Sequence, residues 1–214
     1  MKLYTYFRSS AAYRVRIALN LKGLEYESLP RQLTRGGGEH RGSDYLAVNP
    51  QGLIPLLVDG EATIPQSLAI IEYLEETHPD PPLLPRAAAK RARVRSLALV
   101  IACDIHPLNN LRVLNYLRTP LGHDKAAVNA WYRHWIACGF QALEAEAARG
   151  GSDARHLVGS DVTVADICLV PQMYNARRFD CDLAPYPRLR EISAHLEGLP
   201  AFAKAAPEAQ PDAE

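Results

Sequence analysis

Strand-like and helix-like patterns alternate through the first third of the chain. Lys2–Phe7 alternates apolar and polar positions and is rich in aromatic and β-branched residues, Ala11–Lys22 repeats its apolar positions at helical spacing, and Leu24–Leu29 is again strand-like. This order predicts a βαβ unit with parallel strands and a right-handed crossover, in which Gly23 ends the helix. A short helix is expected over Ser43–Val48.

The stretch Asn49–Glu76 predicts the rest of a sheet. Its apolar run Leu53–Val58 meets Asp59-Gly60, and a second run ends at Ile64-Pro65 before a helix-period pattern begins. Asp-Gly between two apolar runs is a strong hairpin signal. Pro55 cannot donate to a ladder, so we expect it at the entry to its strand, with a cis Ile54–Pro55 bond as one way to turn the chain there. Residues 1–78 are therefore predicted to form a βαβ unit followed by a ββα unit, which together make an α/β domain with a small mixed sheet.

A proline-dense segment at residues 79–86 marks the expected domain boundary, so the predicted division is 1–78, a linker over 79–86, and 87–214. No strand is predicted beyond it. Helical patterns cover Ala87–Leu117, Lys125–Arg149, Val164–Ala176 and Leu189–Leu196, which predicts an all-α second domain. Pro107 is expected to kink the first of these helices. Residues 205–214 are expected to fray.

Thr163 and Asp166 have the spacing of a capping box, to which we assign a structural role. Ser67 stands where another helix begins, after Gln66. A helix start offers unpaired N–H groups and a positive dipole end, so a hydroxyl there forms a receptor for a carboxylate. The alternative is that Ser67 only caps its helix.

Composition excludes several classes of function. The 214 residues are 48% hydrophobic and carry a formal net charge of zero with a pI near 7.1, so nothing suggests binding to nucleic acid or to an acidic membrane surface. The N-terminus lacks the pattern of a signal peptide and no segment is long enough to span a membrane, so we expect a cytoplasmic protein. Its cysteines are scattered without metal-ligand or CxxC spacing, and we expect reduced core residues and no metal: Cys103, Cys138, Cys168 and Cys181.

Several motifs together carry a family resemblance. They are YFRSSAAYRVRIALNLKG from Tyr6, the IPQSLAIIEYLEE stretch from Ile64, VTVADICLVPQ from Val162, and ARRFDCDLAPYP from Ala176. With the Pro-rich linker and the helical second half, the chain resembles a zeta-class glutathione transferase over nearly its whole length. The resemblance implies the cytosolic glutathione transferase fold, a thioredoxin-like glutathione-binding domain before a helical domain, and a homodimer. It also implies glutathione-dependent cis–trans isomerisation of maleylacetoacetate or maleylpyruvate.

The resemblance implies that Ser9 and Ser10 activate the thiol of glutathione. A free thiol has a pKa of about 8.5, and a hydroxyl donor beside a helix N-terminus favours its ionised form. Ala11 stands where the family usually has Cys, which excludes a mixed-disulfide mechanism there. Tyr6 is the alternative activating group, because other classes use a Tyr near this point, although strand alternation also gives it a packing role.

Further site residues follow from the same resemblance. Arg8 and Arg178 are expected to bind the carboxylates of the substrate, because planar arginines suit bidentate carboxylate contacts. His106 and Asn110 are expected on one helix face, at i and i+4. The residues expected to bind glutathione are Ser9, Ser10, Ala11, His40, Ile54, Gln66, Ser67, Asp104, His106, Asn110 and Arg112.

Two other functions remain open at this level. A general glutathione transferase that conjugates or dehalogenates electrophiles would share Ser9 and the glutathione site but would not need carboxylate-binding arginines. A non-catalytic binding module of the same fold is the other alternative, and the intact Arg8-Ser9-Ser10 and Gln66-Ser67 motifs argue against it.

Overall fold

The computed structural model describes residues 1–149 and 155–214. The chain forms two compact units, one of Met1–Leu83 with Gly198–Glu214 and one of Leu84–Glu197. Residues 198–214, predicted to belong to the second domain, group with the first unit.

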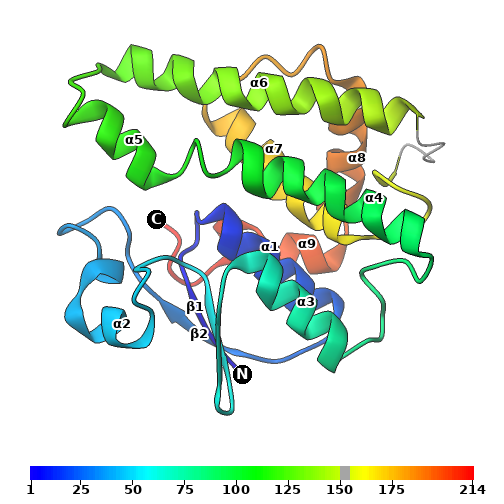
Figure 1. The fold of residues 1–214 in the computed structure, drawn as a ribbon, viewed down its shortest axis with the longest axis horizontal. Helices are drawn as coiled ribbons and strands as arrows, with labels where there is room; N and C mark the ends of the chain where they lie inside the picture. The colour runs from blue at the N-terminus through cyan, green and yellow to red at the C-terminus, as the bar shows by residue number, and fades with distance from the viewer. Residues whose placement is uncertain (150–154) are drawn as a thin grey trace. The chain divides into compact units, whose positions relative to one another are not determined.

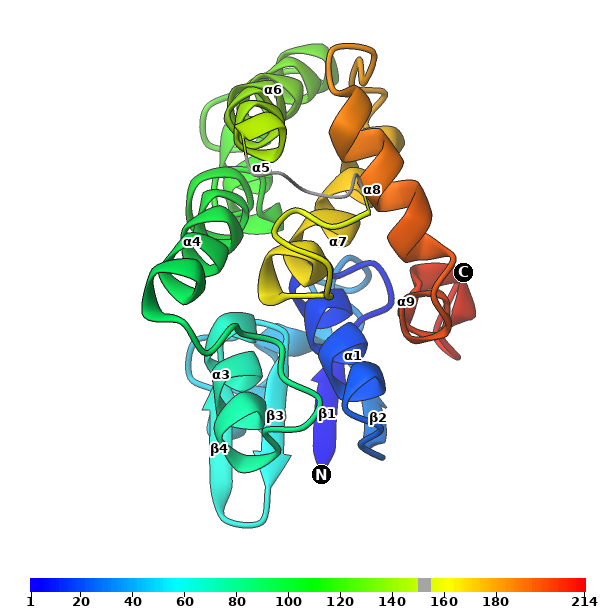
Figure 2. The same ribbon diagram turned by 90° about the vertical axis from the view of Figure 1, so that its right-hand side faces the viewer.

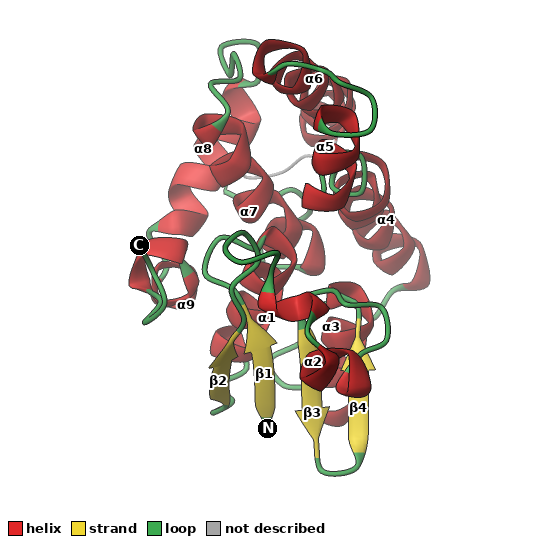
Figure 3. Ribbon diagram, turned by 90° about the vertical axis from the view of Figure 1, so that its left-hand side faces the viewer, coloured by secondary structure: helices red, strands yellow, loops and turns green. Residues whose placement is uncertain are grey.

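The first unit is built on a mixed sheet with the strand order β2-β1-β3-β4. Its strands are β1 (Lys2–Thr5), β2 (Glu27–Pro30), β3 (Leu56–Asp59) and β4 (Ala62–Pro65). β1 pairs parallel with β2, while β3 is antiparallel to both β1 and β4. Consequently β1, β2 and β4 all end at the same edge of the sheet, where β3 begins (Figure 3). We call this the carboxyl edge.

Helices α1 (Ser10–Leu21) and α3 (Ser67–Thr77) cover one face of this sheet (Figures 2 and 3). Both start directly after a strand that ends at the carboxyl edge. The predicted βαβ and ββα orders are confirmed, and α2 (Ser43–Val48) has the expected bounds after a short 3-10 turn, η1 (Glu39–Arg41). Gly23 ends α1 with a φ of 65°, a left-handed conformation that glycine adopts without steric cost.

The entry to β3 matches the prediction from sequence. The Ile54–Pro55 bond is cis, as expected, and Pro55 precedes the first strand residue, so its missing N–H interrupts no ladder bond. Gly60, with a φ of 57°, makes the hairpin turn between β3 and β4. β1 is shorter than predicted and ends at Thr5, because the Tyr6 carbonyl accepts a bond from the Ser9 N–H at 2.9 Å and turns the chain.

The C-terminal segment is ordered against the first unit, so the prediction that residues 205–214 fray is wrong. It forms α9 (Pro200–Ala205) and a 3-10 turn, η3 (Pro207–Ala209). Phe202 of α9 is completely buried, and the Asn20 side chain of α1 donates to the Ala201 carbonyl at 2.9 Å. The composition of the segment suggested disorder because Phe202 is its one large, fully buried apolar side chain, and the contacts that order it come from elsewhere in the chain.

A buried lysine attaches the Pro-rich segment to the first unit. The Lys22 ammonium lies 2.8 Å from Glu75 of α3 and donates to the carbonyls of His78 and Pro81. The Leu83 N–H donates back to the Glu75 carboxylate. Since each charge is both paired and hydrogen-bonded, its burial is compensated.

The second unit is all helical in its described residues, as predicted. Its helices are α4 (Ala88–Leu99), α5 (Leu111–Arg118), α6 (Lys125–Arg149), α7 (Val164–Arg178) and α8 (Pro187–Glu197), with a π-helical turn, η2 (Val100–Ile105). α7 packs against α4 and α8, and α6 packs against α8 and η2 (Figure 1). No helix in the described part of the chain is both long enough and apolar enough to cross a membrane.

The long helix predicted over Ala87–Leu117 is interrupted where Pro107 was expected to kink it. The backbone widens into η2, passes through a turn, and starts again at α5. Two bonds from α6 hold this break in place: Trp131 Nε1 donates to the Leu108 carbonyl at 2.9 Å, and Asn109 Nδ2 donates to the Tyr132 carbonyl at 3.1 Å. The interruption is therefore a fixed feature of the fold and larger than the predicted kink.

The cysteines are free, and three of them differ from the predicted core positions. Cys103 and Cys138 are exposed, Cys181 is half-buried, and only Cys168 is fully buried. Within residues 1–149 and 155–214, no cluster of His, Cys, Asp and Glu side chains is arranged to hold a metal ion.

Asp166 anchors the start of α7 from a fully buried position. The Thr163 N–H and hydroxyl donate to its Oδ2 at 2.8 and 2.9 Å, and the Leu157 N–H donates to its Oδ1 at 2.8 Å. Burial raises the pKa of this carboxyl, while these bonds favour the ionised form. The contacts support the structural role that the sequence predicted for this pair.

We expect Asp166→Ala to lower the free energy of unfolding by about 3 kcal/mol, because it leaves two buried backbone donors without an acceptor. Denaturant unfolding measures this. Asp161→Ala, at an exposed position just before the same helix, is the matched control and should change stability by less than about 0.5 kcal/mol. Similar small effects for both variants would contradict the role of Asp166.

Candidate active site

Ser9 caps α1 at the carboxyl edge. Its Oγ accepts the Ala12 N–H at 3.2 Å, and the Tyr13 N–H donates to its carbonyl at 2.8 Å. The hydroxyl accepts in this bond, so its own proton remains available to donate to a ligand. Capping and thiol activation, which the sequence posed as alternatives, are therefore compatible. Ser10 and Ala11 follow as the first helical residues, and both are buried, with exposed fractions of 7% and 9%.

Tyr6 and Arg8 lie in the turn before Ser9. Arg8 Nη2 donates to the Tyr6 hydroxyl at 3.2 Å, and its guanidinium lies 4.7 Å from the centre of the Phe7 ring. Tyr6 is buried, and its ring packs edge-on against Phe7. The phenol thus accepts from an arginine, and its ring has the packing role that strand alternation suggested.

The entry to β3 is held by polar contacts just before Ile54. The Tyr45 hydroxyl and the Asn49 amide both donate to the Leu53 carbonyl, at 2.6 and 2.8 Å. Tyr45 and Asn49 are almost completely buried, so these contacts fix the peptide that leads into the cis Ile54–Pro55 bond. The backbone of Ile54 is therefore presented in one orientation at the carboxyl edge.

Gln66 joins β4 to α3 with a φ of 73°, a left-handed conformation that a non-glycine residue adopts at a cost of about 1–3 kcal/mol. Its side chain is exposed and donates to the Gln51 side chain at 3.0 Å. Such strain often accompanies functional positions, and here it occurs where α3 begins.

Ser67 is the first residue of α3, and a buried arginine that the sequence analysis missed lies beside it. Arg14 of α1 is only 1% exposed, and its Nη1 donates to Ser67 Oγ at 3.4 Å. The positive end of the α3 dipole, the Ser67 hydroxyl and a guanidinium thus occur together, which is the chemistry of an anion site. One sequence signal could have revealed Arg14: it and Arg16 are charged residues within a helix whose other positions are mostly apolar.

His40 lies in the loop after β2, which also starts from the carboxyl edge. The imidazole is 8% exposed, and its pKa is lowered by burial and by the nearby Arg41. Gly38, with a φ of 90°, passes so close that a Cβ on it would overlap the His40 ring. This loop therefore has one glycine that both its conformation and its packing require.

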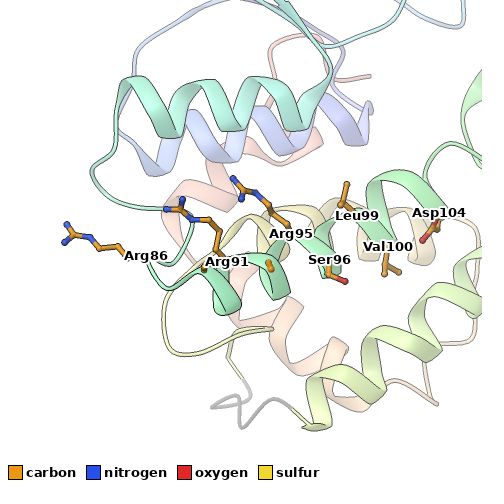
Figure 4. Close-up of a pocket in the computed structure, with 9 residues that line it drawn as sticks. Arg86, Arg91, Arg95, Ser96, Leu99, Val100 and Asp104 are labelled. Carbon is orange, nitrogen blue, oxygen red and sulfur yellow. The ribbon is translucent and has the colours of Figure 1, made fainter.

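The second unit carries the other predicted glutathione residues. Asp104 is exposed at the end of the π-helical turn and lines a cavity of 630 Å³ along α4 (Figure 4). The same cavity is lined by three arginines that the sequence analysis did not single out: Arg86, Arg91 and Arg95. In Figure 4 Asp104 lies at the opposite end of this lining from the three arginines.

His106 and Asn110 do not share a helix face, so that prediction is wrong. Pro107 and the π-helical turn end the helix at Ile105, and Asn110 instead caps the next helix by accepting the Arg112 N–H at 3.1 Å. His106 is half-buried in the turn between the two helices, and Arg112 is exposed in the first turn of α5.

Two adjacent arginines end α7 in different environments. Arg177 donates to Glu197 at 2.7 Å and to Ser193 at 3.3 Å, which ties α7 to α8. Arg178 is exposed, and its guanidinium lies 5.0 Å from the centre of the Phe179 ring. That ring stacks on Tyr132 at 3.6 Å, so a rigid aromatic pair supports Arg178. Within the described residues Arg178 forms no ion pair, and its charge can pair with a ligand.

Together these groups suit a peptide ligand with a carboxylate and a thiol. The carboxyl edge offers a hydroxyl donor at one helix N-terminus, Ser9, and a hydroxyl with a guanidinium at another, Ser67 with Arg14. The two helices follow β1 and β4, and β3 lies between these strands in the sheet. The entry to β3, at the same edge, carries the fixed Ile54 backbone. The residues predicted in this unit thus fall on one edge of one sheet, and they fit glutathione chemically.

Comparisons with known proteins agree with this reading. Residues 3–82 match the family model described as glutathione S-transferase, N-terminal domain. The chain is 56% identical to a probable maleylacetoacetate isomerase from Vibrio cholerae, over 99% of this chain and 97% of that protein. A solved structure titled as the holo form of maleyl pyruvate isomerase, a bacterial glutathione S-transferase of the zeta class, is 50% identical with a TM-score of 0.96 and covers 100% of both chains.

A further structure is that of a maleylacetoacetate isomerase from Methylobacterium extorquens with bound malonate and glutathione. It is 41% identical to this chain, has a TM-score of 0.95 and covers 100% of both chains. Identity of this degree over whole chains extends the similarity well beyond the N-terminal domain. The chain belongs to the glutathione S-transferase family, in its zeta class.

Proposed function

We propose that this protein is a glutathione-dependent cis–trans isomerase of maleylpyruvate or maleylacetoacetate, in the catabolism of aromatic compounds or tyrosine. The observation that carries the proposal is the meeting of two helix N-termini at the carboxyl edge, one capped by Ser9 and the other carrying Ser67 beside Arg14. Whole-chain relatives named for these isomerases support it.

When bound, glutathione supplies a thiolate that adds reversibly to the conjugated cis double bond, which becomes a single bond and can rotate before the thiolate leaves. The role of the protein is to keep the sulfur ionised. Ser9 can donate its proton to a thiolate while its oxygen still accepts the Ala12 N–H, so α1 remains capped during the reaction. The α1 N-terminus adds a favourable dipole, and together the two effects favour the anion.

We assign the carboxylates of the substrate to Arg8 and Arg178. Both arginines rest on phenylalanine rings, Phe7 and Phe179, which restrict the guanidinium while leaving its N–H edge able to form bidentate contacts. A substrate held by its charged ends can rotate at its centre without leaving the site. A general conjugating transferase needs no such pair, which is why these arginines distinguish the two functions.

The remaining binding roles concern glutathione itself. We assign its γ-glutamyl carboxylate to Gln66 and Ser67, its backbone to Ile54, and further contacts to Ser10, Ala11, His40, Asp104, His106, Asn110 and Arg112. We also propose a cytoplasmic homodimer. Leu99 of α4, which is 43% exposed beside the arginine-lined cavity, supports an interface on that helix, because an exposed large apolar residue gains by burial.

Ser67→Ala should weaken glutathione binding by about 0.5–2 kcal/mol, the range for losing a cap or a charge-assisted hydrogen bond. Titration calorimetry measures this. Thr77→Ala removes a hydroxyl from the other end of α3 and should leave the affinity unchanged. Wild-type affinity in Ser67→Ala would exclude Ser67 from the glutathione site.

Ser9→Ala should raise the pKa of the bound glutathione thiol and lower kcat by about 10- to 100-fold, because one charge-assisted bond to the thiolate is lost. Thiolate absorbance as a function of pH measures the first effect. Ser9→Thr keeps a hydroxyl and should retain most of both properties. If Tyr6→Phe shifts the pKa and Ser9→Ala does not, Tyr6 is the activating group.

Arg178→Met should reduce kcat/KM for maleylpyruvate or maleylacetoacetate by about 10- to 100-fold, while turnover of an uncharged aryl halide stays within about twofold. Arg177→Met is the matched control, since Arg177 is already paired with Glu197, and it should affect neither substrate appreciably. Equal losses of Arg178→Met on both substrates would mean that Arg178 supports the fold or glutathione binding and does not hold the substrate carboxylate.

A further inference from the structure

The turn that carries Ser9 is held by residues from two distant parts of the chain. Arg16 lies one helical turn and a half into α1, and Asp212 lies in the last residues of the protein. Both contact Phe7, which stands two residues before Ser9. None of these contacts involves a residue to which a glutathione or substrate role has been assigned.

Arg16 holds the carbonyl side of the turn. Its side chain is completely buried, with Nη2 donating to the Phe7 carbonyl at 2.9 Å and Nη1 to the Tyr6 carbonyl at 3.3 Å. Nη1 also donates to Thr5 Oγ1 at 3.0 Å, and Nε donates to the Ala205 carbonyl at 3.0 Å. Every nitrogen of the guanidinium is therefore used. Burial lowers its pKa to about 10, so the group stays charged at neutral pH.

Asp212 binds the backbone N–H of Phe7, the residue whose carbonyl Arg16 binds. Its Oδ2 accepts the Phe7 N–H at 2.9 Å, although the two residues are 205 positions apart in the chain. The N–H and the carbonyl of Phe7 are thus bound to side chains of opposite charge, and the charge of Asp212 also favours protonated Arg16. A turn residue fixed on both sides has little freedom to change its direction.

The C-terminal segment is anchored well enough to support such a contact. Arg16 and Asn20 of α1 donate to carbonyls of α9, and the Gln210 amide donates to the carbonyls of Lys204 and Ala206. Asp212 therefore extends from a docked helix. If the tail were frayed, the Asp212 contact would have to offset the conformational entropy lost when the tail becomes ordered. Because α9 and Gln210 already order the tail, the Asp212 contact does not carry that cost alone.

We propose that Asp212, together with Arg16, is a positioning residue that fixes the Phe7–Ser9 turn so that the Ser9 hydroxyl points at the glutathione sulfur. This inference rests on the proposed role of Ser9 as thiol activator. The C-terminal tail then acts in the reaction only through the backbone of Phe7. Errors of about 1 Å in the placement of a catalytic group can reduce rates 100-fold, so a single displaced turn is a sufficient cause of lost activity.

The test compares Asp212→Ala with Asp212→Asn and Glu214→Ala in the full-length protein. Asp212→Ala should raise the pKa of the bound glutathione thiol and lower kcat by about 5- to 50-fold, with glutathione affinity within about twofold. Asp212→Asn keeps an oxygen that can accept the Phe7 N–H and should restore most of kcat. Glu214→Ala is the matched control in the same tail, because Glu214 contacts Gln32 and Arg35 instead. It should leave both properties unchanged.

A double variant separates positioning from general damage. If Asp212 acts through Ser9, Asp212→Ala should add little to the loss already caused by Ser9→Ala, since neighbours in one network are not additive. Multiplied losses would overturn the proposal. So would a wild-type thiol pKa in Asp212→Ala, or equal losses of kcat in Asp212→Asn and Asp212→Ala.

Measuring the thiol pKa requires only bound glutathione, so this test does not depend on which substrate the enzyme uses. Absence of isomerase turnover in the wild-type protein would refute the proposed function without touching the pKa comparison. If Ser9→Ala leaves the thiol pKa unchanged while Asp212→Ala raises it, the role of Ser9 fails. That outcome would overturn the positioning proposal as well, because Asp212 would then act on the thiol through a group other than Ser9.

Discussion

The buried guanidinium of Arg16 is the interaction on which the first unit depends. Removing a charge from water costs several kcal/mol unless every polar atom finds a partner, and here the partners are carbonyls of the turn after β1 and of α9. Arg16 thereby brings the carbonyls of Tyr6, Phe7 and Ala205 to one side chain. Arg16 therefore joins the turn after β1, helix α1 and the C-terminal segment, and it acts together with the Ser9–Tyr6 and Asn20–Ala201 bonds.

Strand direction then decides where the chemistry can occur. Because β1 and β4 run the same way, the helices that follow them begin at the same edge, each with unpaired N–H groups and a positive dipole end. β3 runs the other way and so begins there, with its cis Ile54–Pro55 bond. The backbone at this edge, with two helix starts and one strand entry, favours an anionic peptide ligand. The side chains of Ser9, Ser67 and Arg14 add specific contacts to this backbone contribution.

The sequence predicted the local parts of this arrangement well. The Asp59-Gly60 hairpin, the stop at Gly23 and the bounds of α2 and α6 followed from turn chemistry and periodicity, because their causes lie within a few residues. The sequence failed where the partner is far away. Arg14 contacts Ser67 across 53 positions and Asp212 contacts Phe7 across 205, and no short window reveals either pair. For the same reason the tail was predicted to fray although it is docked.

The second unit shows how one proline can have a larger effect than the loss of one hydrogen bond. A kink at Pro107 would have kept His106 and Asn110 on one helix face. Instead the helix widens into a π-helical turn and ends at Ile105, and the next helix, α5, begins with Asn110 as its cap. The break is stabilised because α6 supplies a donor, Trp131 Nε1, to the Leu108 carbonyl and an acceptor, the Tyr132 carbonyl, to the Asn109 amide. In addition, Gly139 of α6 leaves room for Ile105 where a Cβ would overlap it. The polar residues of the break are thus oriented by tertiary contacts, which helical periodicity cannot encode. Any function assigned to them must be argued from α6 as much as from their own segment.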